Sequence, residues 1–233
     1  MQSVGAYSTR HYQISMAWQI VLLSLKLFYR RLGIFLVANV LWLFVSLPLV
    51  TIPAATAALF HLTQRVIAEE RELDLVFATR QHFWEGLRLY WRRATVLGYL
   101  DIVALLLLII AIRFYWISPL VGLSWLVGPL LIMLLTFLGM QLYLFPTLLN
   151  YPDDKIWQHF RRAFFLTLSY PLDTFMLLIW LILLIAVCIT LAGPVLFVLF
   201  ALLALIQSIA LRFIRIQRGE IPPDKADRPI EEA

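Results

Sequence analysis

The stretch from Arg31 to Gln64, RLGIFLVANVLWLFVSLPLVTIPAATAALFHLTQ, sets the pattern for the rest of the chain. Its first part, Gly33 to Ile52, carries no charge, and its 20 residues match the ~20 that a helix needs to cross a bilayer. Pro48 lacks the amide proton of a continuous helix, whereas Pro53 suits the first turn of a new one. We therefore predict a membrane hairpin here. A re-entrant loop and one long kinked helix are the alternatives.

The composition is typical of a membrane protein. The chain is 62% hydrophobic and only 14% charged over 233 residues, whereas a soluble domain averages about 25% charged residues. Several apolar runs are longer than ~18 residues, the length that indicates a spanning helix. The sequence therefore predicts an all-α fold, a polytopic transmembrane helical bundle that forms one domain over residues 1–215. The proline-containing, charged stretch 216–233 predicts a disordered cytoplasmic tail.

Hydropathy divides this domain into three hairpins of apolar helices: 33–68, 94–149 and 170–214. An aromatic and basic segment precedes each hairpin, and such segments are typical of helices that lie in the membrane interface. We predict these interfacial amphipathic helices at 14–31, 77–93 and 156–165. The hairpins then give about six membrane-depth helices, or five if the first hairpin crosses the membrane only once.

Four features recur in the same order in the three units and suggest a three-fold repeat of helix plus hairpin. Each unit has paired arginines, a polar residue early in its apolar span, a proline at its return limb and a glutamine 11 to 13 residues later. The interfacial arginines are Arg30, Arg31, Arg92, Arg93, Arg161 and Arg162. The prolines are Pro53, Pro129 and Pro194, and the glutamines are Gln64, Gln141 and Gln207. Coincidence among basic helices followed by hairpins is the alternative explanation.

The basic residues predict how the chain is oriented. Lysine and arginine gather around the paired arginines and in the tail, and the opposite side offers Arg113 and little else. Because cytoplasmic loops carry the excess of these residues, we predict that both termini are cytoplasmic. The turns near 48–53, 117–125 and 193–194 would then lie on the outer side. In this orientation the interfacial arginines meet water and anionic headgroups.

Five polar residues form a candidate intramembrane site: Asn39, Asp101, Asp173, Gln141 and Gln207. An ionised aspartate at the bilayer centre costs about 2.5–3.5 kcal/mol, so such residues are rare and often functional. The interfacial arginines are within reach of both aspartates, and ion pairs that fix helix packing are therefore one interpretation. An ion, proton or substrate site is the other. The glutamines are more typical of hydrogen bonds between helices.

No catalytic, metal-binding or cofactor motif is recognisable. The four histidines are dispersed and lack metal-ligand spacing such as HExxH, and no glycine-rich phosphate loop is present. The single Cys188 lies in an apolar run, so no internal disulfide is possible. Membrane anchoring explains the aromatic and basic segments better than nucleic-acid binding does. We therefore predict a protein that is not an enzyme and needs no cofactor or metal.

One stretch resembles the YesL-like family of bacterial membrane proteins: Asn39-x-x-Trp42 followed by SLPLVTIPAATAALF at 46–60, with a similar Phe83-Trp84 segment later. The resemblance implies a bacterial plasma-membrane protein encoded near sugar-uptake genes, and hence an accessory role in carbohydrate transport. Its partners would be the bilayer and the membrane subunits of a sugar transporter, for which the small residues of 54–58 offer a helix-packing face. The alternative is a small transporter or channel with its polar residues between the repeated hairpins.

Overall fold

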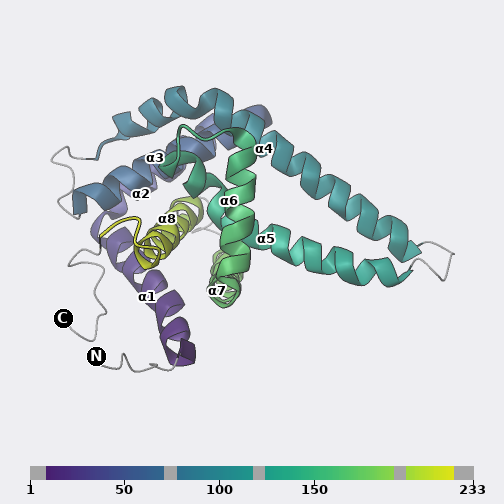
Figure 1. Ribbon diagram of the computed structural model, residues 1–233. Helices are drawn as coiled ribbons and strands as arrows, with labels where there is room; N and C mark the ends of the chain where they lie inside the picture. Colours follow the sequence, from purple (N-terminus) through teal and green to yellow (C-terminus); the bar gives the residue numbers. More distant parts are fainter. Residues whose placement is uncertain (1–8, 71–77, 118–123, 192–197, 223–233) are drawn as a thin grey trace.

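The computed structural model describes residues 9–70, 78–117, 124–191 and 198–222. Eight α-helices lie in these ranges (Figure 1): α1 (Thr9–Arg30), α2 (Leu32–Ser46), α3 (Ile52–Glu70), α4 (Arg80–Ile117), α5 (Val127–Asn150), α6 (Ile156–Ser169), α7 (Pro171–Leu191) and α8 (Phe200–Gln217). Two short 3-10 helices, η1 (Leu49–Thr51) and η2 (Ser124–Leu126), precede α3 and α5. No strand occurs in the described ranges, and the all-α prediction is confirmed.

Four described helices are long and apolar enough to cross a membrane: α4, α5, α7 and α8. Helix α2 is apolar but has only 15 residues. The prediction of a multi-pass membrane protein is confirmed by these helices. The described residues thus contain four such helices by length and composition, and the predicted count of about six, or five if the first hairpin crosses once, stays a prediction.

Helices α2 and α3 form the predicted hairpin. Near the turn, Trp42 Nε1 donates a hydrogen bond to Thr56 Oγ1 over 3.2 Å. At the open end, Arg31 Nη2 lies 2.6 Å from Glu69 Oε1. Pro53 occupies the first turn of α3, where its missing amide proton costs no hydrogen bond. Because the two helices are in contact at both ends, one long kinked helix is excluded.

Helix α3 lies at the centre of the body and contacts α2, α4, α5 and α8. Its alanines at 54, 55, 57 and 58 are completely buried. Small side chains allow neighbouring helices to approach closely, as the sequence suggested. These alanines pack inside the chain, however, so the expectation that they would face a partner protein is wrong.

Helix α4 is one continuous helix of 38 residues, about 57 Å long at 1.5 Å per residue. A separate interfacial helix at 77–93, followed by a span from residue 94, was therefore a wrong prediction for residues 80–93. No proline interrupts α4, and the paired arginines do not end it because arginine is a good helix former. The first part of α4 packs on α3, and its buried residues are Phe83, Gly86, Tyr90, Ala94, Leu97 and Gly98.

The third unit follows its predicted boundaries more closely. Helix α6 ends at Ser169 and α7 begins at Pro171, a residue that favours the first turn of a helix. Helix α8 and the turn after it continue through Pro222, so the tail predicted from residue 216 does not begin that early. Residues 223–233 and most of the predicted turns at 117–125 and 193–194 lie outside the described residues.

The order of helix packing is cyclic. The return helix of each predicted unit packs against the first helix of the next, in the pairs α3 with α4, α5 with α6, and α8 with α1. A three-fold repeat would produce this order. Helix α4 departs from a regular repeat, because it joins the predicted interfacial helix and the span after it into one helix. The repeat therefore stays a prediction.

Two glycines allow α4 to lie directly against α3. A β-carbon built on Gly98 would lie 2.5 Å from Pro53 Cβ, and one built on Gly86 would lie 2.6 Å from His61 Cβ. Distances this short require the helices to move apart. In contrast, a β-carbon on Gly33 of α2 would have nothing within 4 Å.

We expect Gly98→Ala to destabilise the protein by about 1–3 kcal/mol, the usual cost of overpacking, because the proline ring cannot turn away from the added methyl group. Gly33→Ala is the matched control, and it should leave stability unchanged or raise it, since alanine favours helix more than glycine does. Thermal unfolding of the detergent-solubilised variants measures both. Equal midpoints for the two variants would show that α3 and α4 are not in close contact.

Candidate functional site

Asn39, the first predicted polar residue, connects two hairpins. Its side chain is completely buried on α2, and its Oδ1 accepts a hydrogen bond from the backbone N–H of Ala201 over 3.0 Å. The first N–H groups of a helix have no partner within that helix. Asn39 therefore joins α2 to the first turn of α8, a distant part of the chain.

Asp101 and Gln141 join α4 to α5. The amide Nε2 of Gln141 donates to Asp101 Oδ1 over 2.8 Å and lies 3.0 Å from Oδ2. Both residues are half-buried. Gln141 is thus a hydrogen-bond donor between helices, as its residue type suggested, and Asp101 contacts this amide where an interfacial arginine was the expected partner.

Among the described residues, Asp173 is buried without a hydrogen bond to one of its carboxylate oxygens. It lies in the first turn of α7 and is 3% exposed. Within the described part of the chain, its Oδ1 has no hydrogen-bond partner. The next residue, Thr174, shares a hydrogen bond of 2.9 Å with the hydroxyl of Tyr143 on α5. A buried carboxylate oxygen without a partner is unusual, so Asp173 stays a candidate.

Among these five residues, the described contacts bring together Asp101 and Gln141. Asn39 bonds to α8, Asp173 lies at the start of α7, and Gln207 is half-buried on α8. The pseudo-symmetric arrangement around one centre, on which the transporter alternative depends, is not seen among these contacts.

The paired arginines connect helix ends. Arg30 and Arg31 form ion pairs with Glu70 and Glu69 at the end of α3. Arg93 donates a hydrogen bond to the carbonyl of Pro152, in the turn between α5 and α6. The other members of the second and third pairs, Arg92 and Arg161, are exposed, and the Arg161 guanidinium lies 5.8 Å from the centre of the Phe165 ring.

Tyr151 organises the polar contacts between the ends of α5, α6 and α8. The Arg162 guanidinium lies 3.9 Å from the centre of its ring, and that of Arg215 lies at 5.3 Å. The Tyr151 hydroxyl donates to Glu220 Oε2 over 2.5 Å. Burial raises the pKa of Tyr151 above its ordinary value, and the bond to Glu220 acts in the same direction. We call Tyr151, Arg162, Arg215 and Glu220 the Tyr151 cluster.

His159 of α6 is buried near this cluster without a hydrogen bond. Its side chain is completely inaccessible, and neither ring nitrogen has a hydrogen-bond partner in the described structure. Burial lowers the pKa of His159 below its ordinary value, Asp154 opposes this shift, and Arg162 and Arg93 add to it. The His159 imidazole therefore binds a proton less readily than an exposed histidine does.

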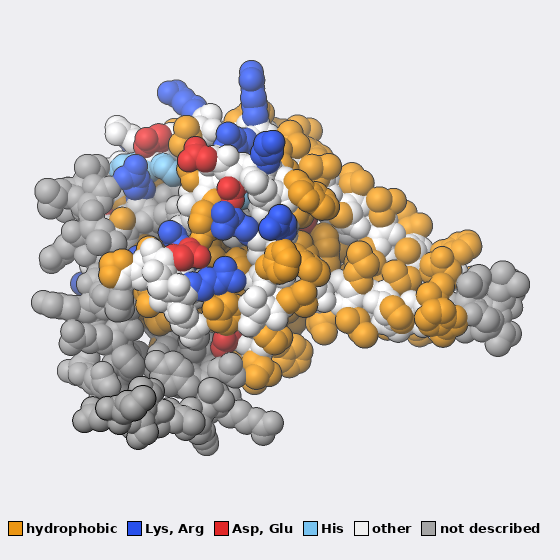
Figure 2. All heavy atoms as spheres, viewed as in Figure 1, with side chains coloured by type: hydrophobic (Ala, Val, Ile, Leu, Met, Phe, Trp, Pro, Cys, Tyr) orange, Lys and Arg blue, Asp and Glu red, His pale blue; other side chains and the backbone are white. Residues whose placement is uncertain are grey.

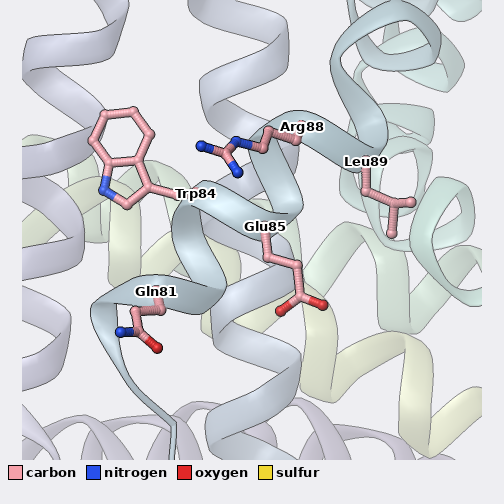
Figure 3. Close-up of a pocket in the computed structure, with 5 residues that line it drawn as sticks. All are labelled: Gln81, Trp84, Glu85, Arg88 and Leu89. Carbon is pink, nitrogen blue, oxygen red and sulfur yellow. The ribbon is translucent and has the colours of Figure 1, made fainter.

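A wide surface hollow lies along the first turns of α4 (Figure 3), where it is lined by Gln81, Trp84, Glu85, Arg88 and Leu89. Trp84 and Arg88 extend to the same side, whereas Glu85 points away from them. One helix supplies all of its described lining residues, so they form one side of an open surface hollow. An aromatic ring beside a guanidinium suits the membrane interface.

Local sequence pattern does not indicate most of the Tyr151 cluster. The pattern marked Arg162 as an interfacial arginine and placed Glu220 in a disordered tail. The available signal was the density of polar residues at the ends of α5 and α8. The residues that pair are far apart in the sequence, however: Asn150 and Arg215 are separated by 65 residues, and Tyr151 and Glu220 by 69. Such pairings cannot be derived from local pattern.

The comparisons with known proteins support one likeness. Residues 35–112 match the model of a family described as a protein of unknown function, DUF624. The match runs from Phe35 in α2 to Ile112 in α4 and covers about a third of the chain. It is consistent with the resemblance to YesL-like proteins, although the matched family carries no such name. No curated protein and no solved structure matches the chain.

His159 predicts a dependence of stability on pH. The folded state holds the imidazole at a lowered pKa, so it binds fewer protons than the unfolded chain below the ordinary pKa of about 6.5. Stability should therefore fall as the pH drops below about 6.5, and this loss should stop below the folded pKa. In His159→Phe, which cannot titrate, the melting temperature should fall less between pH 7 and pH 5. Parallel pH profiles for the two proteins would contradict this prediction.

Proposed function

We propose that this chain is a non-enzymatic membrane protein that assists carbohydrate transport in a bacterial plasma membrane by assembling with membrane subunits of a sugar transporter. One observation carries the proposal. Helices α4 and α5 extend together away from the body (Figure 1). We define this arm as residues 99–117 and 124–138.

The surface of the arm is apolar. Leu107 and Ile110 of α4 are each 62% exposed, and Ile132 of α5 is 69% exposed. Orange apolar side chains cover the arm, whereas charged side chains gather over the body (Figure 2). A surface of this kind belongs in lipid or against other membrane helices.

Two polar residues at the base of the arm favour a protein partner there. Asp101 and Gln141 lie there and are only half-buried. A carboxylate at membrane depth is costly unless other polar or protein groups cover it. A partner helix packed against the base would cover this pair, and polar side chains of that helix could add hydrogen bonds.

The sugar-transport part of the proposal is supported by the resemblance to YesL-like proteins. The matched region 35–112 includes most of the hairpin α2–α3 and most of α4, so it contains most of the α4 half of the arm. The charge distribution supports the proposed orientation, with the ends that carry the paired arginines in the cytoplasm. The tip of the arm would then face the outer side.

We expect photocrosslinkers placed at Leu107 and Ile110 to capture a membrane subunit of a sugar transporter in intact bacteria. Ile182 of α7 is the matched control, because it is 64% exposed on another apolar helix, and a crosslinker there should capture lipid. Deleting the gene should lower uptake of the transported sugar several-fold. Capture of lipid alone at all three positions, with unchanged uptake, would show that the accessory role is wrong.

Thiol labelling in the same cells is the control for orientation. In a Cys188→Ser background, an impermeant reagent should label a cysteine that replaces Trp125, which is 68% exposed near the tip of the arm. A cysteine that replaces Pro222 should stay protected. The reverse pattern would place the arm on the cytoplasmic side.

Asp173 favours a second candidate function, a small transporter or channel. Its buried carboxylate has an oxygen without a hydrogen-bond partner in the described structure. Carboxylates of this kind take part in proton and cation pathways of membrane proteins. The described contacts of Asn39 and Asp101 give this candidate less support than the accessory role has.

A flux assay tests this second candidate. If the chain conducts ions, the purified protein in liposomes should dissipate a proton or sodium gradient, and Asp173→Asn should slow the flux at least about tenfold, because a neutral amide removes the charge that the ion needs. Asp153→Asn, in an exposed turn, should conduct like the original protein. Liposomes that hold their gradient with every protein would exclude a conducting role.

A further inference from the structure

A small cavity lies where α3, α5 and α8 meet near the Tyr151 cluster. Its volume is about 140 Å³, and its polar walls are Gln64, Asn150, Ser208, Arg212 and Arg215. We propose that this basic cavity binds a small oxyanion of the phosphate type. The inference is independent of the accessory role, because it concerns the body of the protein and not the arm.

The charge of the cavity favours an anion. Two arginines line it, and no carboxylate is among its described lining residues. Guanidinium groups bind phosphate oxygens through short, charge-assisted hydrogen bonds, often two at a time. A cation would be repelled by the two guanidinium groups of these walls, whereas an anion would be attracted to them.

Arg215 is held in a fixed position at the edge of the cavity. Its Nη1 donates to Asn150 Oδ1 over 2.6 Å, and its Nε donates to Glu220 Oε2 over 3.2 Å. Asn150 is itself fixed, because its Nδ2 donates to the carbonyl of Pro146 over 2.8 Å. A guanidinium has five N–H donors, so these two bonds orient Arg215 and leave donors for a ligand.

Ser208 supplies an independent indication of a ligand. It is 5% exposed, and its Oγ has no hydrogen-bond partner in the described structure. A buried serine in a helix usually donates to the carbonyl four residues earlier, and Ser24 of α1 does so, with a bond of 2.7 Å to Ile20. Ser208 makes no such bond although it has a helical position of the same kind. Its hydroxyl lines the basic cavity and can donate to an oxyanion there.

The volume limits the size of the ligand. At about 30 Å³ for each water molecule in the liquid, 140 Å³ accommodates roughly five non-hydrogen atoms, the number in a phosphate ion. Pockets for larger ligands have volumes of about 300–1,000 Å³. The oxyanion is therefore free phosphate or the phosphate of a lipid headgroup, and both have the same chemistry toward the arginines.

Thermal unfolding of the purified full-length protein in neutral detergent tests the proposal. Phosphate should raise the melting temperature above that in chloride of equal ionic strength, by about 4 °C when phosphate reaches ten times its Kd. In a second experiment, phosphatidylglycerol is compared with diacylglycerol, which lacks the phosphate. A shift with phosphatidylglycerol alone would identify the lipid as the source of the group.

The variants separate the cavity from general electrostatics. Arg212→Gln and the milder Ser208→Ala should lose most of the shift. Arg218→Gln, which removes the same charge one turn beyond the cavity lining, should keep it. Size-exclusion profiles identify variants that have not folded, and Ser208→Ala decides the result if Arg212→Gln is among them. No shift with either phosphate source, or equal losses in the Arg212 and Arg218 variants, would overturn the proposal.

Discussion

Pro53 on α3 and Gly98 on α4 lie so close that a β-carbon on the glycine would be 2.5 Å from Pro53 Cβ. Gly86 and His61 repeat this contact about three turns earlier along α4. Lipid offers no hydrophobic advantage to helices that pack together, so close van der Waals contact must hold them. The fold satisfies this constraint by placing small residues along both helices. Helices α2, α5 and α8 then pack around α3.

Polar contacts fix the helix ends in addition to this packing. Arg31 pairs with Glu69, Arg93 with the carbonyl of Pro152, and Arg162 with Asp154 at 2.5 Å. Each contact reaches from a basic segment to a helix end or a turn. Among the described residues, Asp101 and Asp173 form no ion pair with an arginine, because these three arginines contact other groups. This arrangement gathers the charged residues over the body and leaves the arm apolar, as a membrane protein requires.

The sequence predicted those features that depend on local composition. Apolar runs predicted the spanning helices, and Pro48 and Pro53 predicted the hairpin because each restricts the backbone locally. The continuity of α4 was missed because the Arg92–Arg93 pair was interpreted as a helix end, although no residue there breaks a helix. The partners of Asn39 and Tyr151 were missed for another reason. Ala201 is 162 residues from Asn39, and one sequence carries no record of such long-range contacts.

The arm and the basic cavity are joined by a continuous set of contacts. Arg93, on the same helix as the arm, bonds to Pro152 in the turn that follows Tyr151. Tyr151 stacks under Arg215, which lines the cavity. These contacts couple the two sites only if the partner protein and the oxyanion both change the preferred position of α4. Because α4 is unbroken from Arg80 to Ile117, a partner that tilts the arm also moves Arg93. Anion affinity would then differ between the free and the assembled protein, and by linkage the anion would change partner affinity equally.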